Sequence, residues 1–118
     1  MLRIFNKEPR AKIVSAAEIR ELREAFEQAM NNSISNILEN RILDINEHIL
    51  RAGRNLQTST TYWFYLNEAE EKSIERHRFC SYITNYFKEL GYHVSFGYAS
   101  WLVGSKCYQY KLSLRWVD

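Results

Sequence analysis

The stretch Tyr108-Gln109-Tyr110-Lys111-Leu112-Ser113-Leu114-Arg115-Trp116 carries the clearest periodic signal in the chain. Large apolar residues alternate with polar residues along its whole length. Because successive side chains of a β-strand point to opposite faces, the alternation predicts a strand with one apolar face and one polar face. The apolar face needs a cover, and the helical stretches upstream are the candidates. We therefore expect helices to shield Tyr110, Leu112 and Leu114 from water.

Two further segments complete a predicted three-stranded sheet. Residues 92–99 alternate large apolar and smaller residues, and with the last strand they form a hairpin whose connection spans 100–106. Residues 57–66 are rich in threonine and aromatic residues, which suit a pleated surface. Both faces of the segment 57–66 are partly apolar. This strand is therefore either central in the sheet or presents its outer face to a partner.

The first predicted helix begins at Ser15. The Ser15 hydroxyl can accept from the Glu18 amide while the Glu18 side chain reaches back to the Ser15 amide, which is a capping box. The apolar residues that follow are three or four apart, as one face of a helix requires; they are Ile19, Leu22, Phe26, Ala29 and Met30. The segment Asn31-Asn32-Ser33 is predicted to end this helix.

Two more helices are predicted downstream. The second starts at Ser33 and ends at Gly53, which can adopt the left-handed conformation that closes a helix. With the first helix it forms either an antiparallel hairpin or one kinked rod. The third starts after Asn67, whose following acidic residues suit a helix N-terminus, and ends at Gly91.

The predicted order is helix, helix, strand, helix, strand, strand. It indicates an α+β fold, in which a small antiparallel or mixed three-stranded sheet packs on helices. If the first strand and the hairpin shared a sheet edge, a right-handed crossover would make the neighbouring strands parallel. The 118 residues, 46% of them hydrophobic and 25% charged, fit one domain, 1–118, with 1–14 as a partly ordered N-terminal arm.

Composition also limits the classes of partner. The formal net charge of +2 argues against a dedicated nucleic-acid binder, although it leaves room for a local basic patch. No apolar run is long enough to span a bilayer, so no membrane partner is expected. The N-terminus carries charge where a signal peptide needs apolar residues, which predicts a cytoplasmic location. Cys80 and Cys107 fit no metal spacing, and we expect them to be free thiols.

No motif with the spacing of a catalytic, cofactor or metal site stands out, and we expect neither an enzyme nor a bound cofactor. Ser73 and His77 share a helix face, but they lack an oxyanion hole and a third orienting group. His48 has no second ligand at metal spacing. Cys80 lies on an apolar helix face, where a buried cysteine acts as a small hydrophobic residue.

Two surfaces are candidate binding sites. The first is the hairpin tip, Trp101-Leu102-Val103, because exposed apolar patches mark contacts; alternatively, the strands are longer and these residues fold over the helices. The second is the outer face of the sheet, where Trp63, Tyr65, Lys111 and Arg115 can gather with His93. Aromatic residues among cations suit nucleic-acid stacking, a protein interface or a solvated face covered by long side chains.

The chain resembles small α+β accessory proteins encoded by tailed bacteriophages, over about residues 41–118. The resemblance is carried by Ile45-Asn46-Glu47-His48-Ile49-Leu50-Arg51-Ala52-Gly53, by Gly91-Tyr92-His93-Val94 and by Leu112-Ser113-Leu114-Arg115-Trp116. It implies a phage accessory or virion-associated protein that acts through protein contacts in the host cytosol, and it carries over no catalytic residue.

The sequence therefore predicts a non-enzymatic protein-binding module that assembles into a particle or inhibits a host factor. The alternative is a small nucleic-acid-binding protein that uses the cationic aromatic sheet face. An open edge on the first strand or the N-terminal arm would also allow a homo-oligomer.

Overall fold

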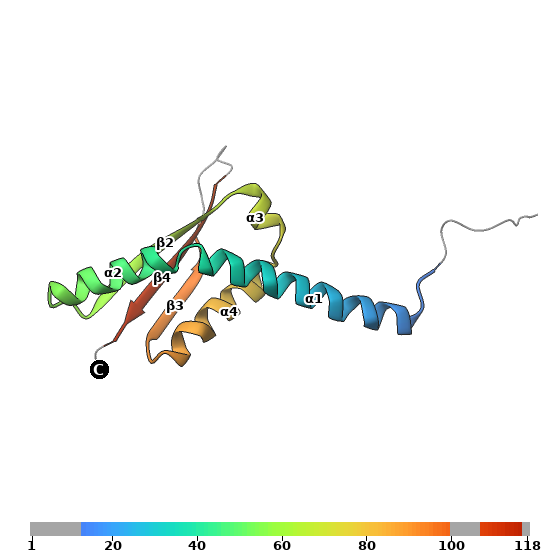
Figure 1. Ribbon diagram of the computed structural model, residues 1–118, viewed down its shortest axis with the longest axis horizontal. Coiled ribbons are helices and arrows are strands. Elements are labelled where there is room, and N and C mark those ends of the chain that lie inside the picture. Colours follow the sequence, from blue (N-terminus) through green and yellow to red (C-terminus); the bar gives the residue numbers. More distant parts are fainter. Residues whose placement is uncertain (1–12, 100–106, 117–118) are drawn as a thin grey trace, which may run out of the picture.

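The computed structural model describes residues 13–99 and 107–116 and has the predicted α+β order (Figure 1). Its elements are α1 (Ala16–Glu39), α2 (Ile42–Arg54), β2 (Ser59–Leu66), α3 (Glu68–Lys72), α4 (Arg76–Glu89), β3 (His93–Tyr98) and β4 (Tyr108–Arg115). The three strands form one sheet in the order β2-β4-β3, and β4 is antiparallel to both of its neighbours. The fold class is thus confirmed.

The predicted apolar face of β4 is buried. Tyr110, Leu112 and Leu114 are at most 1% exposed. Helix α2 packs on β2 and α4 packs on β3, so both helices cover the same face of the sheet. The core continues from that face into the helices and contains, among others, Ile34, Ile45, Phe64, Phe79 and Ile83. The opposite face of the sheet carries the polar half of the alternation.

β2 forms one edge of the sheet, because among the described residues it pairs only with β4. The Trp116 N–H donates to Thr58 O (3.1 Å), whereas the Ala99 N–H donates to Gln109 O (2.8 Å). Since hydrogen-bonded pairs alternate along antiparallel strands, even-numbered β4 residues bond to β2 and odd-numbered ones bond to β3. The first strand is therefore not central, and β4 separates it from β3, so the parallel neighbours considered above do not occur.

The start of α1 is confirmed and its predicted end is wrong. Ser15 and Glu18 form the capping box, with hydrogen bonds of 2.9 and 3.1 Å. The helix does not stop at Asn31-Asn32-Ser33 but continues to Glu39. Burial of Ile34, Ile37 and Leu38 on the same face outweighs the modest helix penalty of asparagine and serine.

α2 starts at Ile42 rather than after Ser33, and it runs on from α1 as the second half of a kinked rod (Figure 1). Arg41 holds this joint. Its guanidinium donates to Ile37 O (3.0 Å), to Tyr65 O (2.9 Å) and to both carboxylate oxygens of Glu70 (3.1 and 3.2 Å). One side chain therefore ties the rod to the end of β2 and to α3.

The predicted helix ends have different outcomes. Gly91 has φ 99° directly after α4 and closes it as expected. Gly53 does not close α2, which runs to Arg54, and the left-handed residue is Leu56 at φ 62°. The third predicted helix is two helices, because Glu75 accepts from the backbone N–H groups of residues 77 and 78 and starts α4 afresh. Asn67 caps α3 as predicted.

Candidate functional site

The outer face of the sheet brings together part of the predicted site. Trp63 lies directly opposite Lys111 in the β2–β4 register, and the Lys111 ammonium is 5.8 Å from the centre of the Trp63 ring. This distance is within the range of a cation–π contact. Tyr65 follows on the same face opposite Gln109. Trp63 is 37% exposed and Tyr65 is 52% exposed, so both rings are accessible.

Arg115 lies at the other end of this face. It is opposite Ser59 on one side and opposite His93 on the other, and the polar residues Thr61, Ser95 and Ser113 separate it from Trp63. The predicted cationic aromatic face therefore exists as two groups, Trp63 with Lys111 and Arg115 with His93. The predicted hairpin-tip residues Trp101, Leu102 and Val103 lie outside the described residues.

A third surface, on α1, was not predicted. The N-terminal half of α1 extends beyond the sheet and the other helices (Figure 1). Its apolar residues Ile19, Leu22 and Phe26, here called the α1 stripe, are 51%, 43% and 61% exposed. The spacing of these residues is visible in the sequence, but an apolar helix face normally predicts burial. Exposed apolar side chains that are contiguous on one helix face mark an interaction site.

The α1 stripe borders a hollow of about 310 Å³. Its lining includes Ile19, Phe26 and Met30, with Arg23 and Glu27 on its flank and Arg78 of α4 at its end. The Arg78 guanidinium donates to Glu27 Oε2 (2.7 Å). Hydrogen bonding to Arg78 lowers the pKa of the Glu27 carboxyl, so Glu27 is anionic at neutral pH. The stripe is thus an apolar strip with fixed charges beside it.

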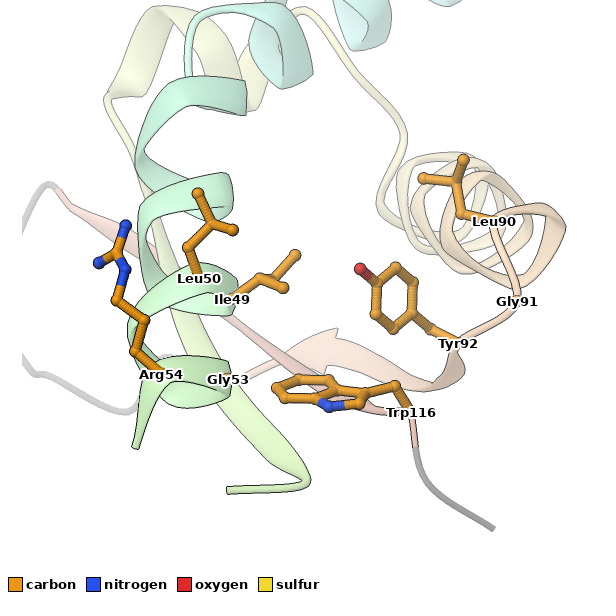
Figure 2. A pocket seen from close by; sticks show the side chains of 8 residues that line it. All are labelled: Ile49, Leu50, Gly53, Arg54, Leu90, Gly91, Tyr92 and Trp116. Atoms are coloured by element: carbon orange, nitrogen blue, oxygen red, sulfur yellow. The ribbon is translucent and has the colours of Figure 1, made fainter. Parts of the chain in front are cut away.

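A larger hollow of about 650 Å³ lies between the end of α2 and the turn from α4 to β3 (Figure 2). Figure 2 shows the Tyr92 ring across from Ile49, which points in from α2, and the Trp116 ring between and below them. The Trp116 and Tyr92 rings meet edge to face, 6.2 Å apart. Its charged lining residue is Arg54. Most of the lining is apolar, so the hollow suits a ligand or side chain with an apolar group.

The residues weighed above for chemistry do not form a site. Ser73 is the C-cap residue of α3, whereas His77 lies in α4, and the Ser73 hydroxyl donates to Glu70 O (2.7 Å), so the two are not a nucleophile–base pair. Both cysteines are thiols. Burial raises the pKa of the Cys80 thiol, which makes it a poorer nucleophile at neutral pH. Within residues 13–99 and 107–116, no group of three histidine, cysteine or acidic side chains is placed to hold a metal ion.

The partly buried acids of α3 stabilise the fold. Glu71 accepts a hydrogen bond from the Tyr110 hydroxyl (2.8 Å) and another from Arg76 Nε (2.6 Å). Burial, together with the Glu71 carboxylate, raises the pKa of Tyr110 far above its usual range. The Arg76 guanidinium also lies over the Tyr98 ring, 3.6 Å from its centre. These contacts join α3, α4 and the sheet, and we assign them no catalytic role.

None of the helices in the described ranges is long and apolar enough to cross a membrane. Comparison with family models, with curated proteins and with solved structures found no match to this chain.

Proposed function

We propose that this chain is a non-enzymatic protein-binding module that docks through the α1 stripe. The observation that carries the proposal is the exposure of Ile19, Leu22 and Phe26 on the half of α1 that extends beyond the sheet and the other helices. An amphipathic helix of this kind offers apolar anchors at the spacing that a helical or grooved partner recognises. The resemblance to phage accessory proteins suggests the setting, namely assembly into a particle or inhibition of a host factor in the cytosol.

The test compares two double variants of the full chain. Leu22→Ser with Phe26→Ser removes the apolar anchors of the stripe. Glu24→Ser with Gln28→Ser is the matched control, because it introduces serine twice into the same exposed helix on its other side. Circular dichroism checks that both variants keep the parent's helix content.

The parent chain and the control should bind the same partner, and the stripe variant should lose it. Any protein that the immobilised parent retains from the native host is purified, and its affinity is measured again with all three chains. A loss of about 10-fold or more in the stripe variant alone supports the proposal. If no binding to any protein, including a second copy of this chain, depends on the stripe, the proposal is wrong.

The Trp63–Lys111 pair favours a second candidate function, the binding of single-stranded nucleic acid on the outer sheet face. A base can stack on the exposed Trp63 ring while Lys111 contacts the phosphate backbone. Fluorescence anisotropy with a labelled oligonucleotide tests this. Affinity should fall with rising salt, and Trp63→Ala should weaken it by about 1–3 kcal/mol. An absence of binding at low salt would eliminate this candidate.

A further inference from the structure

We infer that residues 2–5 of a second copy of this chain add to the free edge of β2 as an antiparallel strand, so that two copies exchange these segments. The free edge carries the first step. β4 bonds to the even-numbered residues of β2, so the N–H and C=O groups of Thr61 and Trp63 point away from the sheet. None of the hydrogen bonds among the described residues uses these four groups. A row of free backbone donors and acceptors selects an extended strand as its occupant.

β2 lacks the sequence features that protect an edge strand. Its eight residues contain no proline and no charged side chain. The other edge strand, β3, has six residues, α4 packs on it, and the Tyr98 backbone hydrogen-bonds to the Cys80 thiol. Long, uncharged edge strands pair with further chains unless something covers them. We therefore expect the added strand at β2.

A hollow of about 430 Å³ beside this edge sets the side-chain chemistry of the occupant. Asp44 of α2 lines it together with Tyr62 and Trp63, and the ion pair of Arg41 with Glu70 also contributes to the lining. Asp44 makes no ion pair with another described residue. The fitting strand therefore carries a cation that points toward Asp44. The neighbours of that cation point to the opposite face, beside the exposed Trp63 ring, and should be apolar.

The segment Leu2-Arg3-Ile4-Phe5 has this pattern, and it lies outside the described residues. In the antiparallel register that we propose, Arg3 lies opposite Tyr62, and its side chain points toward Asp44. The two apolar neighbours of Arg3 then lie on the outer face of the sheet, where one of them is opposite Trp63.

The segment must come from a second copy, because the β2 strand of its own chain is out of reach. α1 has 24 residues and is about 36 Å long, and its C-terminal end is the one near β2, where Arg41 binds Tyr65 O. Its N-terminal end points away from the sheet (Figure 1). Eight peptide units join Phe5 to Ile13 and span at most about 29 Å. Two chains that exchange the segment cover both free edges and form a closed dimer.

A charge exchange in the full chain tests the inference, and sedimentation velocity over a concentration series measures the dimer. The parent should dimerise. Arg3→Glu and Asp44→Arg should each weaken the dimer by about 10-fold or more, and the two changes together should restore most of the affinity, because the exchanged charges again attract. Lys7→Glu and Glu47→Arg are the matched controls. They reverse a charge in the same two parts of the chain and should leave the affinity unchanged.

Thr61→Pro tests the backbone pairing, because proline removes the outward N–H group and leaves the ladder to β4 in place. Thr61→Val keeps the N–H group and is the control. Circular dichroism checks that both variants fold, and only Thr61→Pro should lose the dimer. In the parent, hydrogen exchange of the Thr61 and Trp63 amides should slow as the chain concentration rises, and in Arg3→Glu it should not.

Three results overturn the inference. One is a parent that stays monomeric, and another is a dimer that both Arg3→Glu and Thr61→Pro retain. The third is slow exchange at the Thr61 amide that appears only when a different protein is added, because that protein would then be the occupant of the edge. The proposed function is tested separately, since the Leu22→Ser, Phe26→Ser variant leaves β2 and residues 2–5 unchanged. A dimer that only this variant loses would assign self-association to the α1 stripe and would also refute the exchange.

Discussion

Leu56 should be replaceable by glycine with a gain in stability. It lies just past α2 with φ 62°, and its side chain is 90% exposed. The Leu56 N–H donates to Gly53 O (3.0 Å) and the Gln57 N–H donates to Ala52 O (2.9 Å). This pair of bonds is the Schellman ending, which usually has glycine in the left-handed position. α4 ends with the same two bonds and has Gly91 there.

The magnitude follows from the backbone. A left-handed conformation costs a residue with a side chain roughly 1–2 kcal/mol, which glycine avoids. In return, glycine lowers the free energy of unfolding by about 0.4–1 kcal/mol, because it has more conformational freedom in the unfolded chain. Little burial is lost, since the Leu56 side chain is almost fully exposed. Leu56→Gly should therefore stabilise the fold by about 0.5–1 kcal/mol.

Gly91→Ala is the converse variant. Among the described residues, no atom beyond the two chain neighbours lies within 4 Å of a Cβ built at Gly91. The cost of Gly91→Ala is therefore conformational, and we expect a loss of about 0.5–1 kcal/mol in stability. Urea unfolding measures both changes as shifts of the midpoint at constant slope. For 118 residues, 1 kcal/mol corresponds to about 4 °C in Tm. A neutral or destabilising Leu56→Gly would refute the reasoning, because it would mean that the Leu56 side chain packs against something in solution.

Three further predictions concern the polar contacts. Tyr110→Phe should cost about 1.5–3 kcal/mol at neutral pH, because it removes a bond to the charged Glu71. The pKa of Tyr110 is raised in the folded state, so the stabilisation from its hydroxyl is complete below the unfolded pKa of about 10 and falls as the pH rises above that value. The difference in Tm between the parent and Tyr110→Phe should therefore become smaller in thermal unfolding at alkaline pH. Glu75→Gln should lower Tm at pH 7; because backbone N–H donors lower the pKa of Glu75, this difference should shrink as the pH falls below about 4. Arg41→Lys should cost about 2–3 kcal/mol in urea unfolding, because lysine cannot reproduce the two bonds to Glu70 together with the bonds to two backbone carbonyls.

The parts of the fold that rest on strong local signals were predictable. The alternation in 108–116 identified the buried side chains of β4, and the capping residues Ser15 and Asn67 located two helix starts. A weak local signal gave a wrong end for the first helix. Asn31-Asn32-Ser33 disfavours helix only slightly, and the decision lay with Ile34 and Ile37, whose burial depends on elements far along the chain.

The helix ends and the sheet order depend on information that a sequence pattern lacks. Gly53 is suited to a left-handed position, but α2 continues past it because the turn to β2 starts later, and Leu56 adopts that conformation instead. The helical stretch after Asn67 shows one continuous pattern, and the kink at Glu75 follows from hydrogen bonds to its side chain. The order β2-β4-β3 results from pairing between distant segments, which periodicity alone does not determine.

Part of the candidate site was predictable for the same reason as β4. The two-residue period placed Trp63, Tyr65, Lys111 and Arg115 on the outer face of the sheet, and the strands do present them there. Their separation into two groups required the register. The α1 stripe was hidden because an apolar helix face normally predicts core, and only the length of α1 reveals that no core is available to it.

The length of α1 explains why the stripe is exposed in the part of the chain that the structure describes. α1 has 24 residues and extends about 36 Å at 1.5 Å per residue. β4 has 8 residues and extends about 26 Å at 3.3 Å per residue. α2 continues the rod and packs on β2, so it covers part of the sheet face (Figure 1). Only the C-terminal half of α1 also packs on the core, and Ile19, Leu22 and Phe26 lie beyond the end of the sheet. Their burial therefore requires another chain segment, and a binding partner is the segment that we propose.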